Sequence, residues 1–278
     1  MLVTLQEIIN MAEEGNFCVP AFNFYNAETA MGIMNAAEEL RAPVILQIYP
    51  RLINGEVGYC VSPTALALAQ KATVPVCLHL DHAAAKDEVY KCLRWGYTGI
   101  MQDGSTLSFE ENVALTRSTV EMCNILGIGV EGEIGHVGSA ADDSMGDFTD
   151  PDQAKEFVEK TGVCCLAVLV GNAHGHYKKT PCLDIPRVKA IREACGVPLV
   201  LHGGSGIPDD QVKAAIAAGL RKMNIGTDVC CAFAEGTQAA LADPERSLAV
   251  DVFMKGAVNA VKALAENKIR LCGADGKA

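Results

Sequence analysis

The sequence predicts a single α/β domain with the fold of a (β/α)8 TIM barrel, spanning residues 1–278. Eight short apolar runs alternate with longer amphipathic segments. The runs are mostly apolar without a polar alternation, as in parallel strands that helices cover on the outside. The length of 278 residues suits one such barrel, and no linker or change of composition marks a domain boundary. Eight strand–helix units favour a closed barrel over an open, doubly wound sheet.

The elements follow in a regular order. An N-terminal helix is predicted from the capping-box pattern "TLQE" at residues 4–7. The predicted strands are 17–24, 43–50, 74–82, 99–104, 128–135, 164–171, 198–204 and 222–228. Amphipathic segments such as 27–42 and 209–220 predict the helices between them. The longest polar break, 136–150, predicts a mobile loop over the barrel mouth, and 249–267 predicts an extra C-terminal helix.

The composition argues against several classes of protein. A formal net charge of −11 disfavours nucleic acid or an anionic membrane as a partner, because both attract basic surfaces. The sequence has no signal-peptide pattern and no run of about 18 apolar residues, so a soluble, cytoplasmic protein is expected. The 12 cysteines include no C-x-x-C pair, and we expect reduced thiols that pack as small hydrophobic residues.

Polar residues gather at the ends of the predicted strands. The third run, "VPVCLHLDHAAA" (74–85), stays almost entirely apolar until it reaches Asp81 and His82. Later runs end in, or lead into, Asp103, Glu131, Glu133, His174 and His202. In barrels of this type the catalytic groups come from the carboxyl ends of the strands. These side chains are therefore predicted to meet in one mouth.

Three of the histidines predict a metal site. For any one histidine, a polar strand end is the simpler interpretation. Three imidazoles from three strands, with carboxylates between them, favour a divalent ion held by His82, His174 and His202, with zinc as the leading candidate. His79 lies deeper in the third run and is expected to be a hydrogen-bonded core histidine.

Two glycine-rich segments predict a phosphate site. The segment "HGGSG" (202–206) leads into a helix, and "NIGTD" (224–228) ends the eighth run. Loops after the seventh and eighth strands form the usual phosphate cradle of this fold, with backbone N–H groups as donors. Lys178, just after the sixth run, is expected to add a positive charge.

Metal and phosphate in one mouth indicate chemistry on a phosphorylated carbonyl compound. An aldol cleavage must stabilise an enediolate, through either a lysine iminium or a metal acting as a Lewis acid. Lys222 is placed at the start of the eighth run, the wrong end for an iminium, so the metal route is favoured. Asp81 is then expected to move the proton of the hydroxyl whose C–C bond breaks.

The chain resembles the class II (zinc-dependent) fructose- and tagatose-bisphosphate aldolases over essentially its full length. The motifs that carry the resemblance are "AFNFYNAE", "LHLDHAAAKDEV", "GIMQDGS", "EENVALT", "VEGEIG", "TDP", "GNAHGHYK", "LHGGSGIPD", "NIGTD" and "GADGKA". The resemblance implies zinc ligands at His82, His174 and His202 and the catalytic acid/base at Asp81. It also implies that Asp103 and Glu133 orient the ligands.

The same resemblance implies reversible cleavage of a ketose 1-phosphate or 1,6-bisphosphate to glycerone phosphate and an aldehyde, through a zinc-stabilised enediolate. The residues implied for glycerone phosphate are Gly175, Lys178, Gly203, Gly204, Ser205, Gly226 and Thr227, with Asn224 on the ketose hydroxyls. Members of the family often bind a monovalent cation (Na⁺ or K⁺) beside the phosphate. They are dimers or tetramers, so a homodimer or homotetramer is expected.

The far end of the substrate is where this chain departs from the family pattern. Members that cleave bisphosphates hold the far phosphate with an asparagine on strand 1, a serine or threonine on strand 2 and a basic residue after the strand 8 motif. Asn23 is present here, but Tyr49 takes the second position and Val229–Cys230 the third. The aldehyde half is therefore expected to be unphosphorylated, or to carry an anion that Arg51 meets.

The polar loop departs from the pattern as well, and two alternatives stay open. The family's loop glutamate, which helps protonate the enediolate, is replaced by Ala141, followed by Asp142 and Asp143. One alternative is a zinc hydrolase on the same barrel, which usually has "HxH" on its first strand, a motif that 17–24 lacks. The other is a non-catalytic, accessory aldolase-like subunit, which the intact Asp81 disfavours.

Overall fold

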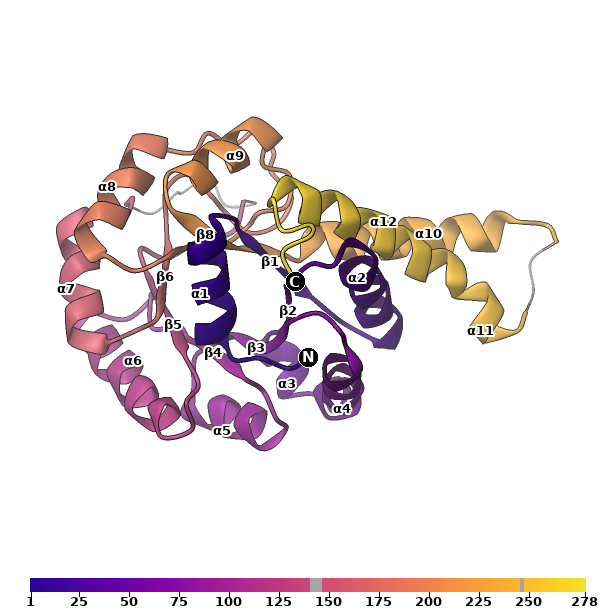
Figure 1. The fold of residues 1–278 in the computed structure, drawn as a ribbon, viewed down its shortest axis with the longest axis horizontal. Helices are drawn as coiled ribbons and strands as arrows, with labels where there is room; N and C mark the ends of the chain where they lie inside the picture. Colours follow the sequence, from indigo (N-terminus) through magenta and orange to yellow (C-terminus); the bar gives the residue numbers. More distant parts are fainter. Residues whose placement is uncertain (141–146, 246–247) are drawn as a thin grey trace.

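Eight parallel strands close into a barrel in the order in which they occur along the chain, with β1 paired to β8 (Figure 1). The structure is a computed structural model and describes residues 1–140, 147–245 and 248–278. The strands are β1 (Val19–Asn23), β2 (Val44–Ile48), β3 (Val76–Ala83), β4 (Gly99–Gln102), β5 (Val130–Ile134), β6 (Cys165–Val168), β7 (Leu199–Leu201) and β8 (Leu220–Ile225). The prediction of a (β/α)8 barrel is confirmed.

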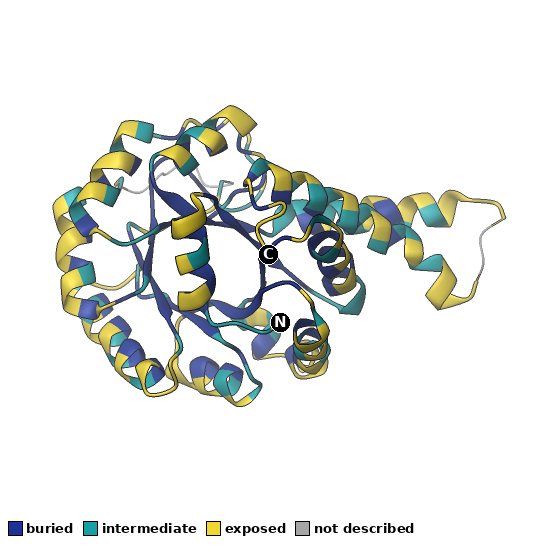
Figure 2. Ribbon diagram, viewed as in Figure 1, coloured by how far each residue is buried: buried dark blue, intermediate teal, exposed yellow. Residues whose placement is uncertain are grey.

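The strands are buried on both faces, which explains why the sequence shows continuous apolar runs. Every strand residue except His82 is buried. Figure 2 shows the strands as a buried layer and the surrounding helices as two-sided, with one face toward the barrel. The strands are shorter than the predicted runs, so His202 lies beyond β7, and His174 lies beyond β6 as expected.

The helices between successive strands lie around the barrel, one further helix precedes β1, and others follow β8. They are α1 (Leu5–Gly15), α2 (Ala27–Leu40), α3 (Pro50–Ile53), α4 (Glu56–Lys71), α5 (Lys86–Arg94), α6 (Phe109–Asn124), α7 (Pro151–Thr161), α8 (Ile185–Cys195), α9 (Asp209–Ala217), α10 (Thr227–Ala242), α11 (Val250–Phe253) and α12 (Lys255–Leu271). No helix in the described part of the chain is both long and apolar enough to cross a membrane.

Helix α1 covers the end of the barrel opposite the predicted site. The Thr4 side chain and Glu7 form the predicted capping box. The amide of Leu5 donates to the carbonyl of Thr98, just before β4, so α1 begins against the amino end of that strand. With this end covered, access from solvent is left to the carboxyl ends of the strands.

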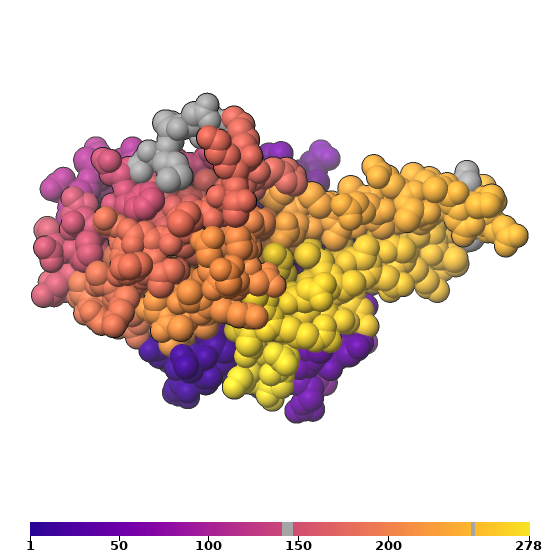
Figure 3. Space-filling model, turned by 90° about the horizontal axis from the view of Figure 1, so that it is seen from above, coloured from indigo at the N-terminus to yellow at the C-terminus, as the bar shows by residue number. Residues whose placement is uncertain are grey.

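An arm of helices projects from the side of the barrel (Figures 1 and 3). Helices α10 and α12 pack against each other, and α12 also packs against α2. The predicted helix at 249–267 is in fact two helices, α11 and α12, which meet at Met254. At the tip, Leu248 and Val250 are exposed.

Candidate active site

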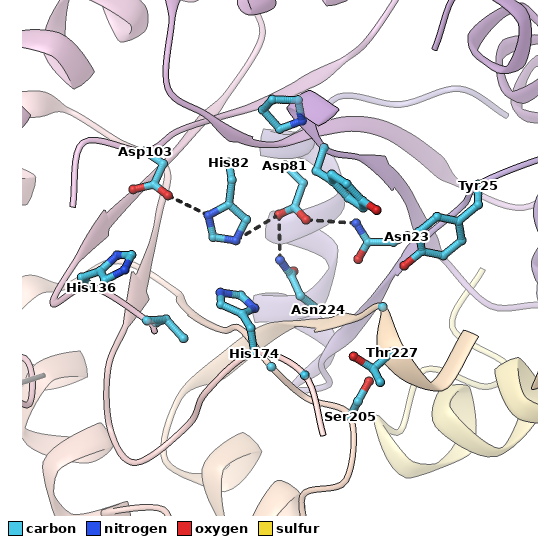
Figure 4. Close-up of a pocket in the computed structure, with 16 residues that line it drawn as sticks. Asn23, Tyr25, Asp81, His82, Asp103, His136, His174, Ser205, Asn224 and Thr227 are labelled. Carbon is cyan, nitrogen blue, oxygen red and sulfur yellow. Dashed lines mark hydrogen bonds and ion pairs between the residues drawn. The ribbon is translucent and has the colours of Figure 1, made fainter. Parts of the chain in front are cut away.

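A cavity of about 420 Å³ opens at the carboxyl ends of the strands (Figure 4). The predicted residues that line it are Asn23, Tyr49, Asp81, His82, Asp103, His174, Gly175, Gly203, Ser205, Asn224, Gly226 and Thr227. They come from strands on all sides of the barrel, and parallel strands bring their carboxyl ends to one mouth. The predicted convergence is therefore what the structure shows.

Other predicted site residues do not line this cavity. Lys178 lines a neighbouring cavity together with Gly175 and Ser205. Arg51 is exposed, and its guanidinium contacts the hydroxyl and the ring of Tyr49. Gly204 packs against β8, where its amide donates to the carbonyl of Asn224 over 2.9 Å. Ala141, Asp142 and Asp143 lie outside the described residues.

The end of β3 brings two neighbouring side chains to the same cavity. Successive residues of a regular strand point to opposite faces, so Asp81 and His82 would normally diverge. At His82 the backbone has a φ of +54°, and the pairing of β3 with β4 shifts between Leu80 and Ala83. A non-glycine residue in this left-handed region costs about 1–2 kcal/mol. This local irregularity lets both side chains line the mouth.

The three predicted ligands face one another. One ring nitrogen from each of His82, His174 and His202 lies within 4.8 Å of the other two. The ring centroids are 4.5 Å apart for His82 and His202 and 5.0 Å apart for His82 and His174. Buried nitrogens of two rings, Nε2 of His82 and Nδ1 of His202, have no hydrogen-bond partner among the described residues. Unpartnered nitrogens that converge on one point fit a metal ion.

Carboxylates fix which nitrogen of each ring is available. Nδ1 of His82 lies 2.8 Å from Asp103 Oδ2, and Nε2 of His202 lies 2.8 Å from Glu131 Oε1. An ionised carboxylate only accepts, so we assign the proton to these nitrogens, which leaves a lone pair on His82 Nε2 and His202 Nδ1. Glu133 Oε2 lies 3.2 Å from His202 Nδ1. Asp103 and Glu133 thus lie beside the rings of His82 and His202.

The electrostatics of the site favour positive charge at its centre. Burial disfavours the charged form of His202, but the carboxylates of Glu131 and Glu133 outweigh burial and raise its pKa to about 10. Without a metal the His202 ring is therefore protonated at pH 7, and it releases the proton on Nδ1 when a metal binds. Burial and the two neighbouring imidazoles lower the pKa of His174 to about 4. His174 is therefore neutral at pH 7, as a metal ligand must be. Carboxylates that stabilise a proton on His202 would also stabilise a cation.

Asp81 is a buried carboxylate held by amide donors. Asn23 Nδ2 donates to Oδ2 over 3.0 Å, and Asn224 Nδ2 donates to Oδ1 over 3.0 Å. Gln47 Nε2 lies 3.3 Å from Oδ2. Burial alone would raise the pKa of Asp81, but the nearby histidines, Lys222 and the Asn23 hydrogen bond lower it below the ordinary value. Asp81 is therefore an ionised group in a fixed orientation, suited to accept a proton.

Two sequence-based expectations are wrong. Lys222 is the third residue of β8, and its ammonium is fully buried inside the barrel, 2.8 Å from Glu131 Oε2. The predicted run began at Lys222, whereas β8 begins at Leu220.

His79 is fully buried as expected, but neither ring nitrogen makes a hydrogen bond within the described residues. Its Nε2 lies 3.5 Å from Glu131 Oε2, and burial lowers its pKa to about 3.

The structure adds residues that the sequence analysis left out of the site. Tyr25 and His136 line the cavity, and Gln47 lies beneath it, next to Asp81. Glu131, which the sequence analysis placed in the mouth, does not line the cavity and instead contacts His202 and Lys222. His136 Nδ1 lies 3.0 Å from the hydroxyl of Ser105, and no strand pattern marks it.

A closed barrel with three converging imidazoles and a held carboxylate defines the chain as a barrel enzyme with a candidate metal centre. The family described as "Fructose-bisphosphate aldolase class-II" matches residues 3–277, and the chain belongs to this family.

Individual relatives agree with this assignment. The Escherichia coli (strain K12) protein YdjI is 40% identical over 282 residues, which cover 100% of both chains. The crystal structure of the YdjI aldolase superimposes with a TM-score of 0.90 at 39% identity, again over 100% of both chains. A candidate fructose-1,6-biphosphate aldolase from Coccidioides immitis has a TM-score of 0.88 at 31% identity, over 99% of this chain and 97% of that one.

Proposed function

We propose that this protein catalyses the reversible, zinc-dependent aldol cleavage of a phosphorylated ketose to glycerone phosphate and an aldehyde. The observation that carries the proposal is the convergence of ring nitrogens of His82, His174 and His202 within 4.8 Å of one another, with Asp81 Oδ1 3.8 Å from His82 Nε2. In the family to which the chain belongs, aldol chemistry is the expected use of such a site.

The three histidines would hold zinc through the nitrogens that the carboxylates leave free. When bound, zinc supplies a Lewis acid that polarises the ketone of the substrate. Asp81 accepts the proton of the hydroxyl on the carbon that becomes the aldehyde. That oxygen then forms a C=O bond, the C–C bond breaks, and its electron pair stays on the glycerone phosphate carbon, which takes up a proton. In the condensation direction Asp81 returns its proton to the new hydroxyl.

The phosphate of the glycerone half would lie against β7 and β8. Ser205 accepts a hydrogen bond from the amide of Asp228 over 3.1 Å, so its own proton remains available to a ligand. Helix α10 begins at Thr227 beside the cavity, and a helix amino terminus favours a negatively charged group. Lys178 lies in the adjoining cavity with Ser205, where it adds positive charge.

The aldehyde half would lie against the aromatic residues that follow β1 and β2. Tyr25 and Tyr49 both line the cavity, with ring centroids 6.1 Å apart, and Arg51 contacts Tyr49. We propose that this half differs from glyceraldehyde 3-phosphate and is either unphosphorylated or carries an anion that Arg51 meets. Asn23, expected at the far phosphate, is already bonded to Asp81 and to Gln47.

A cleavage assay tests this function. The purified protein should cleave ketose 1-phosphates, lose activity with a chelator and regain it with added zinc. Turnover that survives complete removal of metal would contradict the zinc-dependent mechanism. Ketose 1-phosphates should be better substrates than fructose and tagatose 1,6-bisphosphate, and a strong preference for either bisphosphate would contradict the assignment of the aldehyde half.

A further inference from the structure

A buried lysine that the proposed reaction does not use lies at the centre of the barrel. Lys222 has no solvent exposure, and its Nζ is 2.8 Å from Glu131 Oε2 and 2.6 Å from Asn224 Oδ1. Taking an ammonium and a carboxylate out of water carries a large penalty, and an apolar pair is often as stable. The ion pair is therefore weak evidence that Lys222 stabilises the fold. The two residues that Lys222 contacts, Asn224 and Glu131, indicate another role.

Asn224, the first of these residues, connects Lys222 to Asp81. Lysine can only donate hydrogen bonds, so the amide of Asn224 must turn its oxygen toward Lys222. The amide nitrogen then faces Asp81 Oδ1, to which it donates over 3.0 Å. With the amide turned the other way, an oxygen would face the carboxylate and a nitrogen the ammonium. Lys222 thus selects the orientation of Asn224 that holds Asp81.

Glu131, the second of these residues, connects Lys222 to His202. One oxygen of Glu131 pairs with Lys222, and the other lies 2.8 Å from His202 Nε2. Lys222 and His202 together hold the carboxylate of Glu131 in one orientation. This carboxylate places the proton of His202 on Nε2 and leaves Nδ1 to face the other two histidines. Asp81 and His202, which the proposed reaction uses, are therefore both connected to the ammonium of Lys222, each through one intervening residue.

We infer that Lys222 is a positioning residue, which orients Asp81 through Asn224 and His202 through Glu131. This inference rests on the proposed aldolase function. It gives the lysine of β8 a role in the reaction that needs no covalent bond to the substrate.

Lys222→Met tests the inference, because methionine retains much of the volume and removes the charge. Zinc affinity, measured by competition with a chelator, should fall about 10-fold or more, as for other residues that orient metal ligands. At saturating zinc, kcat should fall about 10-fold or more, while KM changes by less than about threefold, because substrate contacts remain.

Two matched variants separate the connection through Asn224 from the connection through Glu131. Asn224→Ala should lower kcat with unchanged zinc affinity, and Glu131→Gln should mainly lower zinc affinity.

Lys222→Met leaves Glu131 buried and unpaired, which can prevent folding. The double variant Lys222→Met/Glu131→Gln removes both charges and supplies a folded protein for the same two measurements. Wild-type zinc affinity or wild-type kcat in either folded variant would overturn the inference. Failure of the proposed function would appear differently, as a wild-type protein that binds zinc and cleaves no ketose phosphate.

Discussion

The two walls of the cavity are built in different ways. The phosphate wall follows the carboxyl ends of β6 to β8 and offers backbone and small side chains, from Gly175, Gly203, Ser205, Gly226 and Thr227. The aromatic wall follows the carboxyl ends of β1 and β2 and consists of Tyr25, Tyr49 and Pro50, with Arg51 behind Tyr49.

The difference indicates which half of the substrate the fold fixes. A backbone wall depends on close approach of main chains, so few substitutions are compatible with it. At Gly203, φ is +63° and an added Cβ would lie 1.9 Å from the carbonyl oxygen of Ala173. The aromatic wall is made of side chains, which can change without altering the path of the chain. We therefore expect the glycerone half to be constant and the aldehyde half to be the specific one.

Asp81 lies between the two walls, and its replacement should have the largest effect. Asp81→Asn should lower kcat about 1,000-fold, within the range for loss of a general acid–base group. The loss should be equal for all ketose phosphates, because the proton transfer is common to them. Steady-state assays on several substrates measure it, with zinc content as the control. Unchanged turnover would remove Asp81 from the mechanism.

Gly203→Ala tests the rigidity of the phosphate wall. The positive φ and the contact with Ala173 should lower the free energy of unfolding by about 3 kcal/mol. Urea unfolding measures this change. Gly138→Ala is the matched control, because a Cβ there meets no atom within 4 Å, and it should shift stability by less than about 0.5 kcal/mol. Equal effects would mean that the close approach at Gly203 is unimportant.

Ser205→Ala sharpens the comparison at the same wall. In the proposed complex this hydroxyl donates to a charged phosphate, so its removal should raise KM about 10-fold. The increase should be similar for every ketose 1-phosphate, whatever its aldehyde half, with kcat little changed. An increase confined to one aldehyde would place Ser205 on the other side of the substrate.

Arg51→Met, on the aromatic wall, should have the smallest effect. Because Arg51 is exposed, its charge should change kcat/KM by only about fivefold. The change should appear with substrates that carry an anion on the aldehyde half and be absent with neutral ones. Arg117→Met, on the exposed face of α6, is the control. A fall for neutral substrates as well would contradict the charge-based explanation.

The sequence by itself determined the barrel and the residues at its mouth. Runs that are apolar on both faces belong to parallel strands under helices, and the barrel then brings their carboxyl ends together. That argument was sufficient to bring Asp81, His82 and His174 to one cavity and to place His202 beside the other two histidines.

Only the tertiary structure decided how these groups are oriented. The alternation along β3 would send Asp81 and His82 to opposite faces, and the backbone irregularity at His82 overrides it. The pairing of Lys222 with Glu131 joins two strands that are not neighbours in the barrel. Such contacts depend on the relative stagger of distant strands, and a pattern within one strand carries no information about that stagger.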